Sequence, residues 1–366
     1  MRNPRANGYN VPVMLHPRFV ADLLRRSARA YAGAASALLA EMRPDFAHMR
    51  QPELFSDVRS ELEGRVLQIA EGIAVDAPEL TADVVGWYRV AYSHRRVPDE
   101  YLQLGFAAIA QVLATELPEG AREIAARHLA AAELASRMSP RELPSFLQSN
   151  GPHVAVARQF LLAVLEDRPE DAVALARRLL DSGMSVADLH DRVLADVQRE
   201  VGRMWMMGEV PVADEHQCSL VVSRVLDLIQ ERLPRPQPGA ARVLAFSAGG
   251  NLHDLGIRVV GQRLQIAGFA VTNLGGNLPT SDLPYVFADR RFDLIAVSAT
   301  MLAHLGEAVH LVEDVRKLCT HPVKILLGGR PFALVSDLHV RLGADAGAGD
   351  AVQAVQAAIS LTSRAH

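Results

Sequence analysis

The spacing of hydrophobic positions separates a helical N-terminal stretch from a mixed helix-and-strand C-terminal third. Between residues 17 and 138 apolar side chains recur every three or four positions, which is the spacing of one face of a helix; an example is the series Leu62, Val66, Ile69 and Ile73. The pattern is interrupted at Pro44, Pro52, Pro78, Pro98 and Pro118. We therefore predict at least five helices in a first domain over 17–138, which is long enough to have its own core.

A second helical domain is predicted after a linker. Residues 139–152 hold three prolines and a glycine, a composition typical of a connecting segment. Helical patterns then cover 153–166, 169–181, 185–206 and 211–233. Ser185 is a suitable N-cap, and the preceding Asp-Ser-Gly sequence is a suitable helix end. Because short connections make neighbouring helices antiparallel, we predict a four-helix bundle over 153–233.

A change of rhythm after the proline-rich residues 233–239 predicts a third domain. Short apolar runs now alternate with helical stretches, at 243–247, 270–274, 294–298, 323–327 and 344–348. This alternation predicts a parallel sheet with helices on both faces, and five strands favour a doubly wound, flavodoxin-like arrangement over 240–363. The predicted fold class is thus multidomain, α and α/β. In such sheets ligands bind beyond the carboxyl ends of the strands.

Composition narrows the classes of function. The formal net charge is −4, whereas a protein that neutralises many phosphates usually has a basic surplus, so we do not expect nucleic-acid binding. The two cysteines, Cys218 and Cys319, imply no disulfide framework. No secretory signal or long apolar span is evident, so we expect a cytoplasmic protein without a membrane partner.

Chemistry-bearing residues follow the predicted strands. His253 comes after the first strand, where a ligand is expected, and a neutral imidazole is a good ligand for cobalt. The sequence Asn251-Leu-His253-Asp-Leu-Gly256 resembles the cobalamin-binding signature Asp-x-His-x-x-Gly. Later strands end in Ser-Ala-Thr and Gly-Gly, where that family has Ser-x-Thr or Ser-x-Leu and Gly-Gly; these residues are Ser298, Thr300, Gly328 and Gly329.

The resemblance implies roles for these positions. His253 would be the lower axial ligand of cobalt, with the cofactor's own base displaced into the sheet. Gly256 would let a helix approach closely, and Ser298 would hydrogen-bond the buried nucleotide tail, for which Gly328 and Gly329 would leave room.

Asn251 departs from the family, which has a carboxylate at this position. A carboxylate behind a ligating histidine raises its basicity, so we expect a weaker lower ligand here. The remaining histidines of this region lack such a context and are predicted at the surface; they are His304, His310, His321 and His339.

The predicted bundle adds a second motif. Bundle and sheet together resemble the corrinoid-binding pair of methionine synthase, and Trp205-x9-Glu215-His216 resembles the light-sensing adenosylcobalamin receptors that repress bacterial carotenoid genes. The resemblance implies that Trp205 packs beside the adenosyl group and that Glu215 binds its hydroxyls. His216 would approach cobalt after the adenosyl group leaves. A tryptophan is large enough to act as an apolar wedge that must move when its neighbour departs.

The N-terminal helices do not resemble a DNA-binding domain. Joined to a cobalamin module, they are similar to the photocobilins, in which a globin-like domain holds a linear tetrapyrrole such as biliverdin. Arg95 and Arg96 could pair with bilin propionates, next to Tyr92 and His94; equally, these residues could be ordinary core and helix-end residues, or His94 could bind haem. Because no cysteine precedes Cys218, a bilin in this domain would be non-covalent.

Three functions therefore stay open. The first is a photoreceptor, not an enzyme, that binds adenosylcobalamin and a bilin, forms light-dependent homodimers and signals to an unknown downstream protein. The second is a corrinoid shuttle for a methyltransferase system. The third is a haem-globin sensor joined to a cobalamin-binding module.

Overall fold

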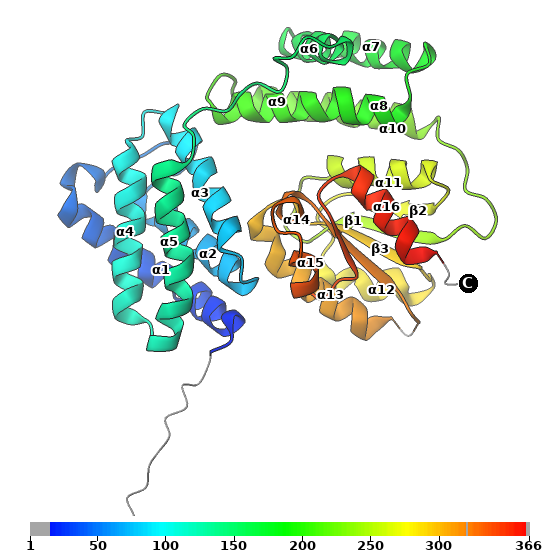
Figure 1. Cartoon of the computed structure of the whole chain (residues 1–366). Helices are drawn as coiled ribbons and strands as arrows, with labels where there is room; N and C mark the ends of the chain where they lie inside the picture. Colours follow the sequence, from blue (N-terminus) through cyan, green and yellow to red (C-terminus); the bar gives the residue numbers. More distant parts are fainter. Residues whose placement is uncertain (1–14, 320, 364–366) are drawn as a thin grey trace, which may run out of the picture. The chain divides into compact units, whose positions relative to one another are not determined.

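The computed structural model describes residues 15–319 and 321–363, and these form two compact units (Figure 1). The first unit combines the chain up to Ala82 with Glu100–Arg137. The second combines Asp83–Asp99 with the chain from Met138 onward. Helix α3 (Pro78–Ser93) therefore begins in the first unit and ends in the second.

Helices make up the first unit, as the sequence predicts. Its elements are α1 (Pro17–Met42), a 3-10 turn (Pro44–Phe46), α2 (Val58–Ala74), the start of α3, α4 (Asp99–Glu116) and α5 (Glu119–Met138). The apolar series on α2 is buried because it faces α1, and Leu62, Val66, Ile69 and Ile73 are all inaccessible to solvent. Asp57 begins α2 by accepting a hydrogen bond from the amide of Ser60, at 2.9 Å.

A four-helix bundle, here called the cap, opens the C-terminal part of the second unit. It consists of α6 (Pro152–Leu165), α7 (Pro169–Asp181), a rod made of α8 (Val186–Leu189), a π-helical turn (His190–Leu194) and α9 (Ala195–Met206), and α10 (Val212–Gln230). Ser185 caps α8 as predicted, because its hydroxyl accepts from the amide of Asp188. Phe160, Val197 and Leu226 are fully buried in the bundle core.

A five-stranded parallel sheet, here called the base, completes the unit. Its strands are β1 (Arg242–Ser247), β2 (Ala270–Asn273), β3 (Leu294–Ser298), β4 (Lys324–Gly328) and β5 (Ala346–Ala348), in the order β2-β1-β3-β4-β5. This is the predicted flavodoxin-like order, which reverses between β1 and β3. The strands read as continuous apolar runs because helices cover both faces: α11 (Leu255–Ile266) and α16 (Ala351–Thr362) on one, α12 (Leu283–Ala288) and α13 (Leu305–Leu318) on the other.

The register of the sheet aligns the strand ends that the sequence singles out. Ser247 of β1 lies opposite Ser298 of β3, and Ser298 lies opposite Gly328 of β4. The three residues therefore form one row at the carboxyl edge of the sheet. Two short helices follow β4 and precede β5, α14 (Arg330–Leu334) and α15 (Leu338–Arg341).

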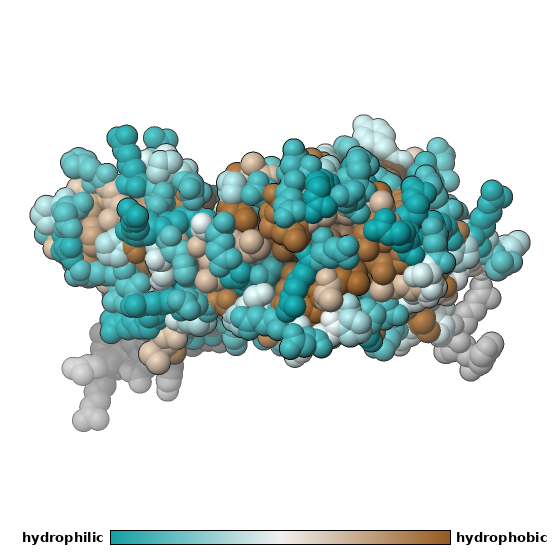
Figure 2. Space-filling model, turned by 90° about the horizontal axis from the view of Figure 1, so that it is seen from above, coloured by the Kyte–Doolittle hydropathy of each residue, from teal (hydrophilic) through white to brown (hydrophobic). Residues whose placement is uncertain are grey.

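The outer layer of the cap is formed by α6 and α7 (Figure 1). From this side the surface shows hydrophobic side chains between hydrophilic ones (Figure 2), and Leu162 of α6 is 52% exposed. Within the described residues, no helix combines the length and the hydropathy needed to cross a membrane.

Candidate functional site

His253 lies in the loop between β1 and α11, at the carboxyl edge of the sheet. Its imidazole is exposed, while its backbone is fixed on both sides. Its amide donates to Oδ1 of Asn251 at 3.1 Å, and its carbonyl accepts from the hydroxyl of Ser247 at 3.2 Å. The loop thus presents an imidazole to the space above the strand ends.

Asn251 is fully buried, and its amide holds this loop to the neighbouring strand. Its Nδ2 donates to the carbonyl of Ser298 at 3.0 Å and to the hydroxyl of Thr300 at 3.1 Å. Its Oδ1 accepts from His253. A carboxylate could not donate to the Ser298 carbonyl, so the asparagine suits a position that requires a donor and an acceptor.

A second imidazole lies beside His253. His304 ends the short 3-10 turn Leu302–His304, is 6% exposed, and its ring centre is 6.4 Å from that of His253. The surface position predicted for His304 is therefore wrong, because the turn folds the side chain under the loop. Its Nδ1 accepts from the amide of Met301 at 3.2 Å. Burial, with a smaller contribution from His253, lowers the pKa of His304 and favours a neutral ring.

The glycines after β4 bring two backbones together. Gly329 has φ +127°, a conformation open to glycine alone, and a Cβ there would lie 2.4 Å from the carbonyl oxygen of Ala299. Gly328 is less restricted, since its Cβ would meet the Ala348 carbonyl at 3.4 Å. At Gly256 a Cβ would meet nothing within 4 Å, so the predicted close approach of a helix is wrong; the missing side chain leaves open space instead.

That open space is a largely apolar cavity of about 490 Å³ between cap and base. The base contributes Gly256, Ser298, Gly328 and Gly329, and the cap contributes residues of the π-helical turn and α9, among them His190, Leu194 and Gln198. Its size falls in the range of ligand sites. The glycines suit a flat ligand with a buried tail, and the exposed imidazole of His253, two residues before the lining residue Leu255, suits a metal that takes one nitrogen.

Helix α11 connects cap and base next to this cavity. Nε2 of the buried His190 lies 2.9 Å from Oε1 of Gln262, whose Nε2 donates to the Leu226 carbonyl at 2.7 Å. Arg258 pairs with Asp227 at 2.6 Å. Burial lowers the pKa of His190 to about 4, so its ring is neutral at physiological pH. Sequence reasoning missed His190, although a π-helical turn often marks a functional position.

Glu215 and His216 lie in the first turns of α10. Nδ1 of His216 is 2.7 Å from Oε2 of Glu215, and the imidazole is otherwise exposed. Oε1 of Glu215 accepts from the Ser219 hydroxyl, which also lies 3.2 Å from Oε1 of Gln198. The single hydroxyl proton serves one of these oxygens at a time, so Ser219 contacts both the predicted motif and Gln198, which lines the cavity.

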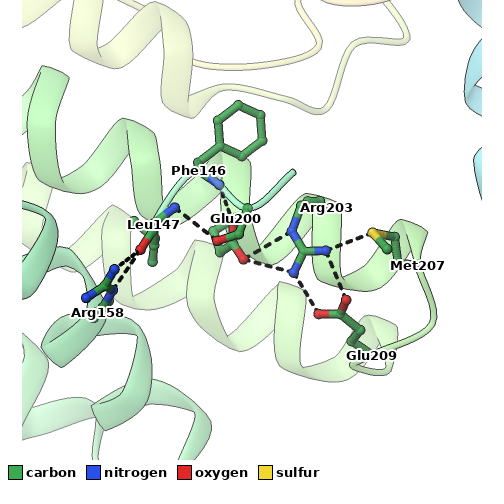
Figure 3. Close-up of polar contacts among 8 residues, drawn as sticks. Phe146, Leu147, Arg158, Glu200, Arg203, Met207 and Glu209 are labelled. Carbon is green, nitrogen blue, oxygen red and sulfur yellow. Dashed lines mark hydrogen bonds and ion pairs between the residues drawn. The ribbon is translucent and has the colours of Figure 1, made fainter. Parts of the chain in front are cut away.

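Trp205 is half-buried in the last turn of α9, and a buried ion-pair network holds that turn from within the cap (Figure 3). Arg203 bonds Oε1 of Glu200 through Nε and Nη2, at 3.1 and 2.9 Å, and both oxygens of Glu209 at 2.9 and 2.7 Å. The other Glu200 oxygen accepts from the amide of Phe146 in the linker. The network thus fixes the loop between α9 and α10.

The end of α3 holds Trp205 from the other side. Arg95 donates to the carbonyls of Trp205 and Met206 at 2.5 and 2.6 Å, and its guanidinium lies 5.4 Å from the Trp205 ring centre. The ring of Trp87 is 5.8 Å from that of Trp205. Sequence reasoning missed these contacts because about 110 residues separate Arg95 from Trp205, and no local pattern encodes that pairing.

The other residues proposed to bind a bilin differ in how exposed they are. Tyr92 is 1% exposed, Arg96 is exposed with φ +59°, and Nε2 of His94 lies 3.1 Å from the Arg141 carbonyl. Their role toward a pigment stays a prediction. Arg89 is a further candidate that sequence reasoning missed. It is 9% exposed, and its Nε and Nη1 are buried without a hydrogen-bond partner among the described residues.

Comparison with known proteins agrees with the geometry. Residues 241–359 and residues 156–230 each match a family described as B12 binding domain. The HTH-type transcriptional repressor CarA of Myxococcus xanthus is 29% identical over 155 residues, which are 42% of this chain and 51% of the repressor, so the chain spans about half of that relative's length. The trimethylamine corrinoid protein of Methanosarcina barkeri is 23% identical over 54% of this chain and 94% of its own.

One solved structure shares the fold. The monomethylamine corrinoid protein of Methanosarcina barkeri superposes with a TM-score of 0.50 at 21% identity, over 57% of this chain and 99% of that protein. At this level of identity the likeness concerns the fold of cap and base.

Proposed function

We propose that this chain, which carries a B12-binding module in its cap and base, is a light sensor that binds adenosylcobalamin between them. One observation carries the proposal most directly. Glu215 accepts a hydrogen bond from Ser219, which also contacts Gln198 at the cavity wall on the cap side, while His253 lies at the strand ends of the base. Polar residues therefore line the cavity on both sides, Gln198 from the cap and Ser298 from the base, and Asn251 holds the His253 loop to Ser298.

The residues of cap and base would each have a separate role in binding the cofactor. Adenosylcobalamin supplies a cobalt–carbon bond that visible light breaks. His253 would bind the metal, and the cavity lined by Gly256, Gly328 and Gly329 would take the ring edge and the nucleotide tail. Glu215 would bind the adenosyl hydroxyls. Trp205 would pack beside the adenosyl group, and its turn would shift when that group leaves.

Reconstitution in darkness tests this function. Protein freed of cofactor is expected to retain adenosylcobalamin through gel filtration, and green light is expected to cause a spectral change that persists in the dark, together with a change in oligomeric state. His253→Ala should weaken cobalamin retention about tenfold or more, because the lower ligand is lost. His310→Ala, on the exposed side of α13, is the matched control. A wild-type protein that stayed colourless would overturn the proposal.

A corrinoid shuttle for methyl transfer is the second candidate, favoured by the likeness to the methylamine corrinoid proteins. It needs a partner methyltransferase and makes no use of the Trp205–Glu215–His216 arrangement. Methylcobalamin bound without a lasting response to light would favour it.

A non-covalent bilin, such as biliverdin, is the further part of the proposal. The buried, unpartnered Nε and Nη1 of Arg89 support an acidic ligand near α3, because a buried donor without an acceptor is costly. The remaining nitrogen of Arg89, Nη2, pairs with Asp99 at 3.7 Å. We expect Arg89→Met to weaken biliverdin binding about tenfold in an absorbance titration, while the exposed Arg96→Met leaves it unchanged. A Soret band in the purified protein, with no uptake of biliverdin, would instead indicate a haem sensor.

A further inference from the structure

Residues 83–99 lie more than fifty positions before the cap in sequence but belong to the same compact unit as cap and base. At one end of this segment, Asp83 pairs with Arg330, whose Nε is 2.9 Å from Oδ2 and whose Nη2 is 2.5 Å from Oδ1. Arg330 directly follows the Gly328-Gly329 pair. The bidentate geometry gives this pair directional strength, and it anchors α3 to the base.

At the other end, Arg95 anchors the segment to the cap. The carbonyls of Trp205 and Met206 stand at the C-terminus of α9, where backbone acceptors lack partners within the helix and a positive charge is favoured by the helix dipole. Arg95 is 8% exposed, so water competes little for these bonds. Trp87, which lies eight residues before Arg95 on α3, adds a ring contact with Trp205.

The two anchors are separated by the length of a rigid element. From Asp83 to the end of α3 at Ser93 the helix rises about 15 Å, at 1.5 Å per residue. A helix of this length that contacts the base at one end and the cap at the other restricts how far they can separate at the end of the cap that carries Trp205.

We propose that residues 83–99 form a strut between base and cap, in which Arg95 is the positioning residue for Trp205. Movement of the Trp205 turn must break or reorient the Arg95 bonds, and α3 then passes the change along its length toward Asp83. The signalling role rests on the proposed light-sensing function. The strut itself consists of contacts within the protein and can be tested without the cofactor.

Tryptophan fluorescence and hydrogen exchange of the cofactor-free protein test the strut. The chain has two tryptophans, Trp87 and Trp205, and both lie in this cluster. Arg95→Ala should shift the emission to longer wavelength and accelerate amide exchange at residues 203–211 about tenfold or more, because two charged hydrogen bonds are lost. Arg96→Ala, the exposed neighbouring arginine, is the matched control, and Arg95→Lys should restore exchange in part.

The ion pair between Asp83 and Arg330 provides a second, independent test of the strut. Asp83→Arg should also accelerate exchange at residues 203–211, and adding Arg330→Asp should reverse the effect by restoring the ion pair in the opposite sense. If Arg95→Ala matched Arg96→Ala, or if the charge-swapped pair gave no recovery, the strut would be refuted, whatever cofactor the protein binds.

Experiments on the adenosylcobalamin-bound protein distinguish a failure of the light-sensing function from a failure of the strut. In the adenosylcobalamin-bound wild type, illumination should accelerate exchange at residues 83–95. Absence of any lasting light-induced spectral change would reject the light sensor while the cofactor-free variants still report on the strut. A spectral change without faster exchange at residues 83–95 would reject the transmission of the signal through α3.

Discussion

Replacing Gly329 by alanine is expected to destabilise the base by about 3 kcal/mol or more and to abolish cobalamin retention. The backbone at φ +127° is strained for any residue with a Cβ, and the added carbon would lie 2.4 Å from the carbonyl oxygen of Ala299. That oxygen belongs to the backbone and cannot rotate away. Relief requires the end of β4 to move from the strand-end row that includes Ser298, which lines the cavity.

Gly343→Ala is the control that separates backbone strain at a positive φ from a steric clash of the added Cβ. Gly343 also has a positive φ, +78°, but its Cβ would make an ordinary 3.6 Å contact with Val312. This variant should lose about 1–2 kcal/mol and should keep the cofactor. The measurements are urea unfolding followed by circular dichroism, and cobalamin retained after gel filtration. Equal losses in the two variants would show that the close approach at Ala299 has no energetic role.

The second large effect is expected in the cap, where Arg203→Met should cost about 3–5 kcal/mol. The side chains of Arg203 and Glu200 are 8% and 6% exposed, so removal of the guanidinium leaves a buried carboxylate that still accepts from the Phe146 amide but has lost its positive partner. Glu209 loses the same partner, and the loop that follows Trp205 is released. Tryptophan fluorescence during urea unfolding should report the change directly, since Trp205 is two residues away.

Arg224→Met is the control for charge removal alone. Arg224 pairs with Glu170, but the side chains are 45% and 77% exposed, and surface pairs of this kind contribute less than about 1 kcal/mol. A loss in Arg203→Met as small as that in Arg224→Met would mean that the network in Figure 3 does not hold the Trp205 turn.

Much of the architecture follows from local patterns. The helical periodicity, the N-cap at Ser185 and the strand–helix alternation predict the bundle and the parallel sheet. The observed strand order, β2-β1-β3-β4-β5, agrees with the doubly wound form. The position of His253 at a strand end could also be predicted, because parallel strands place their carboxyl ends at one edge. These features depend on neighbours within a few residues or on general rules of strand connection.

Other features of the site depend on where distant segments meet. The sequence indicates that Asn251 replaces a carboxylate, but its three hydrogen bonds show why a group that both donates and accepts stands there. The surface position predicted for His304 was wrong, because its burial depends on how a short turn packs under a neighbouring loop. The role predicted for Gly256 was wrong for a similar reason: a glycine's surroundings are set by the packing of other elements.

The amino-acid sequence alone determined the elements, their order and the residue types at the strand ends, because periodicity and turn chemistry act over a few positions. Tertiary structure alone decided that Arg95 caps the helix of Trp205, that Asp83 reaches Arg330, and that cap and base enclose a cavity. Such pairings join residues more than 100 positions apart, and they arise from the angles at which helices pack, which hydrophobic spacing does not specify.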